Sequence, residues 1–163
     1  ILLIVRKYSL EIFQIDLRLK NFMTIASITT DINIGPYKIP SNAQNMIMNN
    51  YAVRAKLQVE LVIPEPIMSD QLATTQWLNN EFIFSHLIFT SYHQLPFEKV
   101  HFNKVLKNLS NATFHFAIEG LNGKGIGFIN KCYEESIYFK SAQTIESKNT
   151  NWLELYNIFK KNF

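Results

Sequence analysis

One stretch of sequence decides the fold of this chain: residues 24–52 are TIASITTDINIGPYKIPSNAQNMIMNNYA. Residues 24–32 are rich in Ile and Thr, which favour a β-strand. A polar loop with glycine and proline follows. Ser41 is then a suitable N-cap for a helix over residues 42–57, where apolar residues recur at helical spacing. In an α/β protein, a loop between a strand and a helix lies at the carboxyl edge of the sheet, where ligands usually bind.

The alternation of strands and helices continues along the chain. Further strands are predicted at residues 58–63, 86–92 and 113–119, a loop at 120–127, and helices at 71–82, 97–109, 127–142 and 152–162. Strand followed by helix, repeated, predicts parallel pairing with helices on both faces. We therefore expect one α/β domain over residues 23–163, with three layers and a mostly parallel sheet of four or five strands.

Residues 1–22 differ from the remainder of the chain. The chain begins with Ile1 and not with Met, and Met23 opens a new strand pattern. Two interpretations stay open. The segment 9–22 forms a leading helix, or residues 1–22 are an N-terminal extension that is not native to the domain. The apolar start, ILLIV, is followed at once by Arg6 and Lys7. Because a membrane span needs about 20 apolar residues, we predict none here.

Composition bounds the class of protein. Hydrophobic residues make up 47% and charged residues 18%, as expected of a globular domain. The net charge is +3, and residues 1–22 carry +2 of it, from four basic and two acidic side chains, which leaves +1 for the body. A nearly neutral body is a poor footprint for nucleic acid, so no nucleic-acid partner is expected. The single cysteine, Cys132, excludes an intramolecular disulfide and favours a reducing, cytoplasmic location.

Polar residues follow each predicted strand. They are Asp31, Gly35 and Lys38 after the first, Glu65 after the second, Ser91, His93 and Gln94 after the third, and Glu119 after the fourth. Parallel strands would bring all four sets to one edge of the sheet, where carboxylate, histidine and lysine side chains can bind a polar ligand or move a proton. The alternative is that these residues cap helices and order loops. His93 is the best acid–base candidate, because the ordinary pKa of histidine lies near neutrality.

No complete motif for a cofactor or a metal is present, and we predict neither. The segment GLNGKGIGF, residues 120–128, lacks the Gly and Ser/Thr positions of a phosphate-binding loop. The four histidines show no spacing typical of a metal site.

Three separated segments resemble one family. They are IPSNAQNMIMNNYA (39–52), IFTSYHQLP (88–96) and FHFAIE (114–119). The matching positions are Gly35, Pro40, Gln44, Asn45 and Tyr51, then Glu65 and Met68, then Ser91, Gln94, Leu95 and Pro96, then His115, Phe116, Ala117 and Glu119. Together they resemble the sporadic carbohydrate cluster proteins, which are small bacterial proteins encoded among surface-polysaccharide genes. Lys38 stands nearest to the arginine usual in the first loop, and Ala52 replaces a usual cysteine.

The order of elements also resembles the catalytic domain of serine recombinases, so the expected fold is resolvase-like or flavodoxin-like. Ser27 and Thr29 occupy the positions of the recombinase arginine and nucleophilic serine. Phosphodiester transfer needs several cations on the phosphate, and after Met23 the only arginine is Arg54. Recombination chemistry is therefore not expected, and a degenerate recombinase-like protein is the weakest interpretation.

The resemblance implies a cytoplasmic protein of surface-carbohydrate biosynthesis that binds a sugar or nucleotide-sugar, with no reaction specified. The predicted ligand-binding residues are Asp31, Gly35, Lys38, Gln44, Asn45, Ser91 and Gln94, and His93 with Glu65 or Glu119 would supply acid–base chemistry. The alternative is a non-catalytic partner or scaffold of a biosynthetic enzyme, which would use aromatic residues of the C-terminal segment. Self-association as a homo-oligomer is compatible with both.

Overall fold

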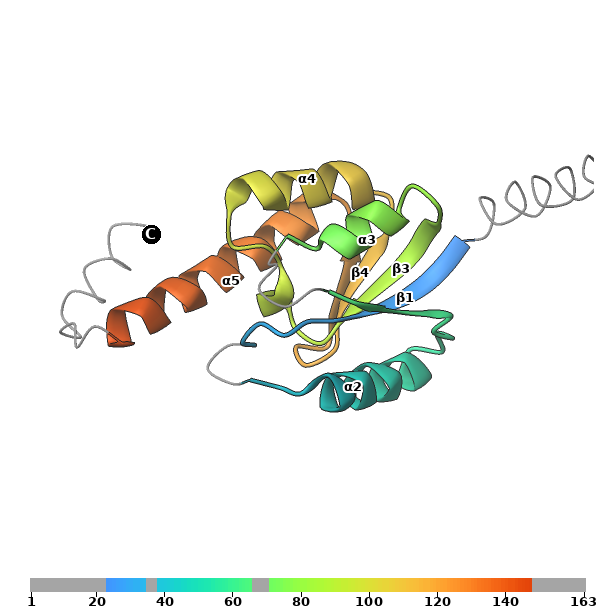
Figure 1. The fold of residues 1–163 in the computed structure, drawn as a ribbon, viewed down its shortest axis with the longest axis horizontal. Coiled ribbons are helices and arrows are strands. Elements are labelled where there is room, and N and C mark those ends of the chain that lie inside the picture. The colour runs from blue at the N-terminus through green and yellow to red at the C-terminus, as the bar shows by residue number, and fades with distance from the viewer. Residues whose placement is uncertain (1–22, 35–37, 66–70, 148–163) are drawn as a thin grey trace, which may run out of the picture.

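A computed structural model describes residues 23–34, 38–65 and 71–147 of the 163-residue chain (Figure 1). Five strands form one sheet in the order β2-β1-β3-β4-β5. They are β1 (Met23–Thr29), β2 (Leu61–Pro64), β3 (Ile83–Phe89), β4 (Thr113–Phe116) and β5 (Leu121–Lys124). The first four strands run parallel, and β5 runs antiparallel to β4. The prediction of an α/β fold with a mostly parallel sheet is confirmed.

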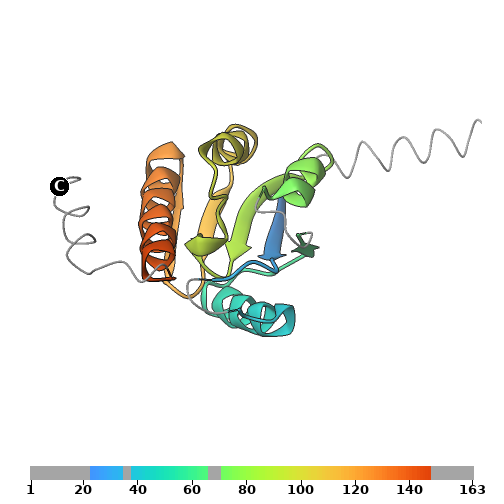
Figure 2. The same cartoon turned by 60° about the vertical axis from the view of Figure 1, so that its left-hand side comes forward.

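Helices cover both faces of this sheet, as predicted. They are α2 (Ser41–Arg54), α3 (Ala73–Leu78), the 3-10 helix η1 (Tyr92–Gln94), α4 (Lys99–Leu109) and α5 (Ile126–Ser147). Helix α2 lies on one side of the sheet, and α3, α4 and α5 lie on the other (Figures 1 and 2). Within the described residues, no helix combines the length and the apolar character needed to cross a membrane.

Two hydrophobic cores follow from this layering. The larger core lies between the sheet and α4 and α5, where Phe89, Phe114 and Phe116 from β3 and β4 pack with Phe102 and Ile129. The smaller core lies under α2 and contains Met48, Tyr51, Ala52, Ile88 and Ala117. The α2 face therefore has less apolar packing, and polar side chains take up part of its interior.

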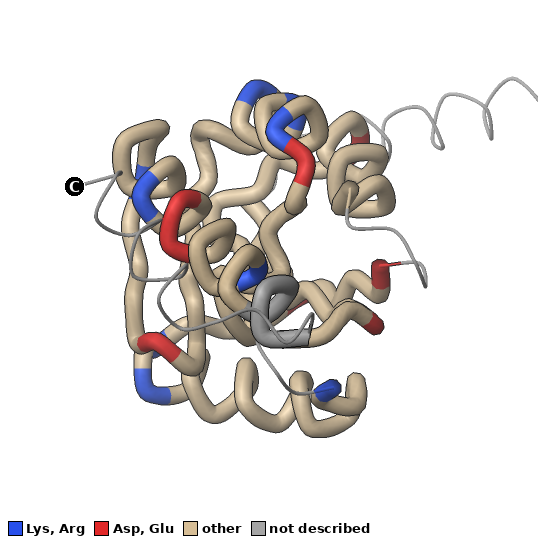
Figure 3. Tube along the Cα trace, turned by 90° about the vertical axis from the view of Figure 1, so that its left-hand side faces the viewer, with Lys and Arg blue, Asp and Glu red and all other residues tan. Residues whose placement is uncertain are grey.

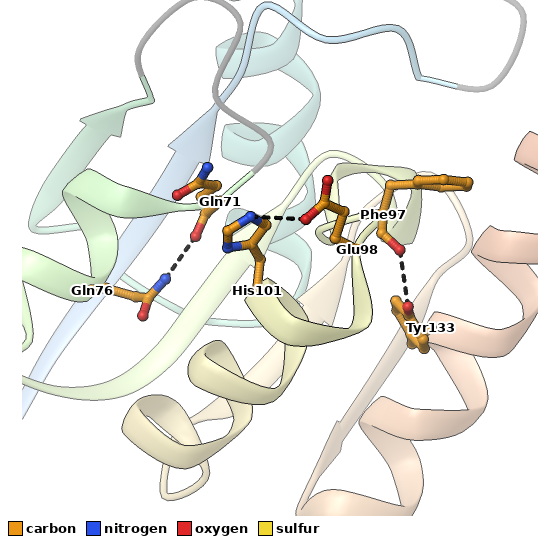
Figure 4. Close-up of polar contacts among 6 residues, drawn as sticks. All are labelled: Gln71, Gln76, Phe97, Glu98, His101 and Tyr133. Atoms are coloured by element: carbon orange, nitrogen blue, oxygen red, sulfur yellow. Dashed lines mark hydrogen bonds and ion pairs between the residues drawn. The ribbon is translucent and has the colours of Figure 1, made fainter.

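Helices α4 and α5 are held together through one tyrosine. The ring of Tyr133 on α5 stacks on Phe102 of α4, with ring centres 3.8 Å apart. Its hydroxyl donates to the carbonyl oxygen of Phe97 at 2.9 Å (Figure 4). Near this contact, His101 pairs with Glu98 in the first turn of α4 at 3.1 Å, and the Gln76 amide donates to the Gln71 carbonyl (Figure 4). The Tyr133 contacts therefore hold α5 against α4, and α5 also contacts η1, which follows β3.

The glycine-rich segment 120–127 is not simply a loop, so that prediction is wrong in part. Residues 121–124 form β5, although Leu-Asn-Gly-Lys has little intrinsic preference for a strand. Their backbone pairs with the open edge of β4 after a turn in which Gly120 has a φ of 65°. At Gly123 a Cβ atom would lie 2.5 Å from the ring of Phe128. Two of these glycines are therefore required by the turn and by the packing of α5.

Several boundaries also moved. The third strand, predicted at 86–92, lies at Ile83–Phe89, because it pairs with β1 from Met23 onward. The helix predicted at 127–142 extends over Ile126–Ser147. The possible leading helix at 9–22 and the helix predicted at 152–162 lie outside the described residues.

The chain reverses its direction of winding between β1 and β3. Helix α2 connects β1 to β2, and the chain then crosses back through α3 to β3, on the other side of β1. The strand order 2-1-3-4-5 is that of flavodoxin-like sheets, which bind ligands at this switch point. Here, the antiparallel direction of β5 is a difference from a fully parallel sheet.

Two buried glutamines join the chain segments at this switch point. Gln44 of α2 accepts a hydrogen bond from the backbone N–H of Thr30 and donates to the carbonyl oxygens of Thr30 and Ile39 at 2.6 and 2.7 Å. Gln94 of η1 accepts from the backbone N–H groups of Thr90 and Ser91.

The two amides also meet each other, because Gln94 Nε2 lies 3.2 Å from Gln44 Oε1. The same nitrogen donates to Thr30 Oγ1 at 3.0 Å. Both glutamines are fully buried, with 0% exposure. We call this pair the switch-point glutamines. They hold the ends of β1 and β3 and the start of α2 in one arrangement.

Replacing Gln94 by alanine should cost at least about 2 kcal/mol of unfolding free energy, because it leaves several buried backbone and side-chain groups without partners. Urea denaturation monitored by circular dichroism measures this loss. Gln58→Ala is the matched control, since Gln58 is exposed, and it should change stability by no more than about 0.5 kcal/mol. Equal effects of the two substitutions would contradict the structural role of Gln94.

Candidate functional site at the carboxyl edge of the sheet

Ser91 and Glu119 meet at the carboxyl edge. Ser91 follows β3, and its hydroxyl accepts a hydrogen bond from the backbone N–H of His93 at 3.2 Å, which caps η1. The same hydroxyl donates to Glu119 Oε1. Parallel pairing continues past the end of β4, since the N–H groups of Ala117 and Ile118 donate to the carbonyl oxygens of Phe89 and Thr90. This continued ladder carries Glu119 to its position beside Ser91.

The Glu119 carboxyl group is only partly satisfied. Its second oxygen, Oε2, is buried and has no hydrogen-bond partner within the described residues. Burial raises the pKa of Glu119, and the hydrogen bonds from Ser91 and from backbone N–H groups offset part of this rise. A carboxyl group held toward its protonated form can both donate and accept a hydrogen bond. Glu119 therefore has one free position for a polar group of a ligand.

His93 is buried next to this pair. It is 8% exposed, and its ring contacts the rings of Tyr92 and Phe139, with centres 4.7 and 5.1 Å away. Its Nδ1 atom has no hydrogen-bond partner in the described parts of the chain. Burial, assisted by the charge of Lys140, lowers the pKa of His93 to about 4. The imidazole is consequently neutral at pH 7 and can take part in proton transfer or hydrogen bonding without a charge.

Two more buried polar atoms at the same edge have no hydrogen-bond partner among the described residues. They are Thr90 Oγ1, directly before Ser91, and Asn45 Oδ1, near the start of α2. Buried polar atoms without protein partners are uncommon and are usually satisfied by water or a ligand. With Glu119 and His93, the described part of this edge has four such residues.

A pocket of about 450 Å³ opens beside Glu119 on the α2 face of the sheet. Its walls are Tyr51, Arg54 and Ala55 of α2 on one side and Ala117, Ile118, Glu119, Gly120 and Asn122 on the other. Glu119 thus belongs to both the Ser91 contact and the pocket. The pocket has room for a monosaccharide-sized ligand, at the lower end of the usual range for small-molecule sites.

The structure distributes the predicted residues over several roles. Ser91, Gln94 and Glu119 are brought together, and His93 lies beside Ser91. The side-chain amides of Gln44 and Gln94 make hydrogen bonds within the switch point, so their role is structural. Asp31 is half-buried and Lys38 is exposed, and no contact of either supports a ligand role. Gly35 lies outside the described residues.

Glu65 is held by helix α3. One carboxylate oxygen accepts from the backbone N–H of Thr74 at 3.0 Å, and the other accepts from both the backbone N–H and the hydroxyl of Thr75. The alternative interpretation of the polar strand ends, helix capping, therefore describes Glu65 well. Of the two carboxylates considered as partners of His93, only Glu119 has an oxygen free for other chemistry.

Sequence reasoning missed Tyr51, Arg54 and Asn122 as pocket residues. Tyr51, Arg54 and Ala55 are three and four positions apart, so they lie on one face of α2. Nothing in the sequence indicates that this face adjoins β4 and β5, which begin 58 and 66 residues after Ala55. In the described residues, no group of three or more His, Cys, Asp or Glu side chains could hold a metal ion.

Acid should destabilise this edge through His93. Its pKa rises from about 4 in the folded protein to the ordinary 6.5 on unfolding, so the unfolded chain binds more protons and the unfolding free energy falls as pH drops from about 6.5 to 4. Between pH 7 and pH 5 this amounts to about 2 kcal/mol. In urea titrations, His93→Gln should lose correspondingly less stability than the wild type over that range, whereas the control Gln58→Ala, at an exposed residue that does not titrate, should lose as much as the wild type. Parallel losses in all three proteins would refute this assignment.

Comparison of the chain with protein-family models, with curated proteins and with solved structures found no match. The candidate site therefore rests on the geometry of the carboxyl edge alone.

Proposed function

We propose that the protein binds a sugar or nucleotide-sugar at the carboxyl edge of its sheet and acts in the cytoplasm in the synthesis of a surface carbohydrate. One observation carries the proposal of a ligand there. The Glu119 carboxyl group accepts from Ser91, keeps a second buried oxygen without a partner in the described residues, and lines a pocket of about 450 Å³. The resemblance of residues 24–119 to the sporadic carbohydrate cluster proteins supports the ligand class.

Sugar hydroxyls suit this site because each can donate and accept a hydrogen bond. Glu119 Oε2 is a buried polar atom of a pocket-lining residue that such a hydroxyl would satisfy, and His93 lies outside the pocket lining, beside Ser91. Asn122 and Arg54 also line the pocket and add an amide and a cation for polar substituents. If the protein acts on its ligand, His93 and Glu119 would be the acid–base residues, because burial shifts their pKa values in opposite directions.

Nucleic acid is not the ligand that we propose. Over the described residues, both signs of charge occur around the molecule (Figure 3). A nucleic-acid site would instead gather basic side chains on one face.

A second candidate function is that of a partner or scaffold for a biosynthetic enzyme. It is favoured by apolar side chains near the start of α4 and along α5: Phe97, Val100, Tyr138 and Phe139 are 48%, 64%, 41% and 51% exposed. Lys140 lies 5.9 Å from the ring centre of Phe97, so these two segments are neighbours. Size-exclusion chromatography with light scattering tests whether this surface drives association. The wild type is compared with the double variant that carries both Phe97→Ser and Phe139→Ser.

Thermal-shift measurements against a panel of nucleotide-sugars and free sugars test the first proposal. At a ligand concentration of 100 times Kd, binding adds about 2.7 kcal/mol, which raises the Tm by several degrees. Glu119→Gln and Ser91→Ala should abolish or strongly reduce the shift. Glu134→Gln is the charge-matched control on exposed α5 and should retain it. A panel without any shift, or a shift that both site variants preserve, would rule out a sugar site at Glu119.

A further inference from the structure

A chain of hydrogen bonds runs beneath α2 and does not involve Ser91 or Glu119. The Tyr51 hydroxyl on α2 lies 3.0 Å from Nδ1 of His115 on β4. The other ring nitrogen of His115, Nε2, lies 2.8 Å from Nδ1 of His86 on β3. Three side chains from three elements thus form one continuous path.

This path joins the pocket to a more accessible position. Tyr51 lines the pocket beside Glu119, and His115 is 5% exposed and fills the space between the sheet and α2. His86, at the far end, is half-buried and therefore within reach of water. The path begins where we propose that a ligand binds and ends outside the core.

The atoms along the path can pass a proton so that Tyr51, His115 and His86 all end neutral, with the negative charge left on the ligand oxygen and the proton released to water. In one arrangement, Tyr51 donates its hydroxyl hydrogen to His115 Nδ1, and His115 Nε2–H donates to His86 Nδ1. When both protons move along their hydrogen bonds, His115 becomes the other neutral tautomer and His86 releases the proton of its Nε2 to water. The Tyr51 oxygen then takes a proton from a hydroxyl group in the pocket, and the electron pair of that O–H bond stays on the ligand oxygen.

The surroundings of His115 favour the neutral ring that this path requires. Burial and the neighbouring His86 lower the pKa of His115 to about 4. From the other packed elements, β5 places Asn122 opposite His115 and Lys124 opposite Thr113, and α2 supplies Arg54 to the pocket. The carboxyl group in this pocket is that of Glu119, which lies with Ser91 at the end of the sheet.

We propose that Tyr51, His115 and His86 form a proton relay that ends in the pocket, with Tyr51 as the group that exchanges a proton with a hydroxyl-bearing ligand. The ligand part of this inference rests on the sugar site proposed above. Tyr51 would be a further catalytic residue beside the acid–base pair proposed above, and His115 and His86 would act through it.

Nuclear magnetic resonance of the ¹⁵N-labelled full chain tests the relay without a ligand. At pH 7, His115 should be neutral, with both ring nitrogens hydrogen-bonded. Tyr51→Phe should shift the ¹⁵N resonance of His115 Nδ1 and leave the ring resonances of His101 unchanged. The ring N–H of His115 should exchange with solvent through His86. Exchange should therefore slow at least tenfold in His86→Phe and in His86→Gln, which keeps a hydrogen-bond acceptor but cannot pass a proton.

Two outcomes would overturn the relay: exchange at the wild-type rate in His86→Gln, or a His115 Nδ1 resonance that does not respond to Tyr51→Phe. A nucleotide-sugar that raises the Tm should also change the tautomer ratio of His115 in the wild type and not in Tyr51→Phe, and an unchanged ratio would exclude the ligand as a proton source. The exchange measurement uses the free protein. A negative exchange result would therefore not contradict ligand binding at Glu119. A sugar panel without any shift in Tm would likewise not contradict the exchange result.

Discussion

The contact between the buried amides of Gln44 and Gln94 is the interaction on which the candidate site depends. The sheet changes its direction of winding between β1 and β3. The residues that directly follow these two strands therefore have backbone N–H groups that no neighbouring strand satisfies, namely those of Thr30, Thr90 and Ser91. Glutamine is long enough to reach both, and its amide offers donors and an acceptor at once. The two side chains thus stand in for the missing ladder and bring α2, η1 and both strand ends into one rigid unit.

This unit explains the position of the neighbouring polar groups. Because Gln94 holds the N–H of Ser91, the Ser91 hydroxyl has a defined direction and meets Glu119. Burial then changes the chemistry of these groups: it favours the neutral forms of Glu119 and His93. A site in which burial shifts both the acid and the base toward their neutral forms suits an uncharged, hydroxyl-rich group, such as the sugar part of the proposed ligand.

The α2 face carries polar chemistry because its apolar core is small. Among the described helices, α2 alone covers it, and His115 of β4 points to this face between Phe114 and Phe116, which belong to the larger core. A buried histidine in such a place needs partners on both nitrogens, and Tyr51 and His86 supply them. The same requirement that stabilises the core produces the path along which we propose that protons move.

The sequence predicted much of the fold and part of the site. Alternating strand and helix patterns identified the layered α/β domain, since periodicity reports directly on which side chains are buried. Polar residues after each strand identified the carboxyl edge. Glu65 shows the limit of that argument, because a carboxylate that ends a strand serves equally well as a ligand group or as the cap of a helix, and only the threonines of α3 distinguish the two.

The sequence by itself determined the alternating order of the parallel strands and helices and the edge at which polar groups gather, because these follow from local preference and spacing. Only the tertiary structure decided which polar residues have spare hydrogen-bonding capacity, that Gln44 and Gln94 are structural, and that Tyr51, His115 and His86 form a chain. It also turned Leu121–Lys124 into a strand. The physical reason is common to all of them: hydrogen-bond partners and edge pairing arise between segments far apart in the chain, and the spacing of residues within one segment does not record them.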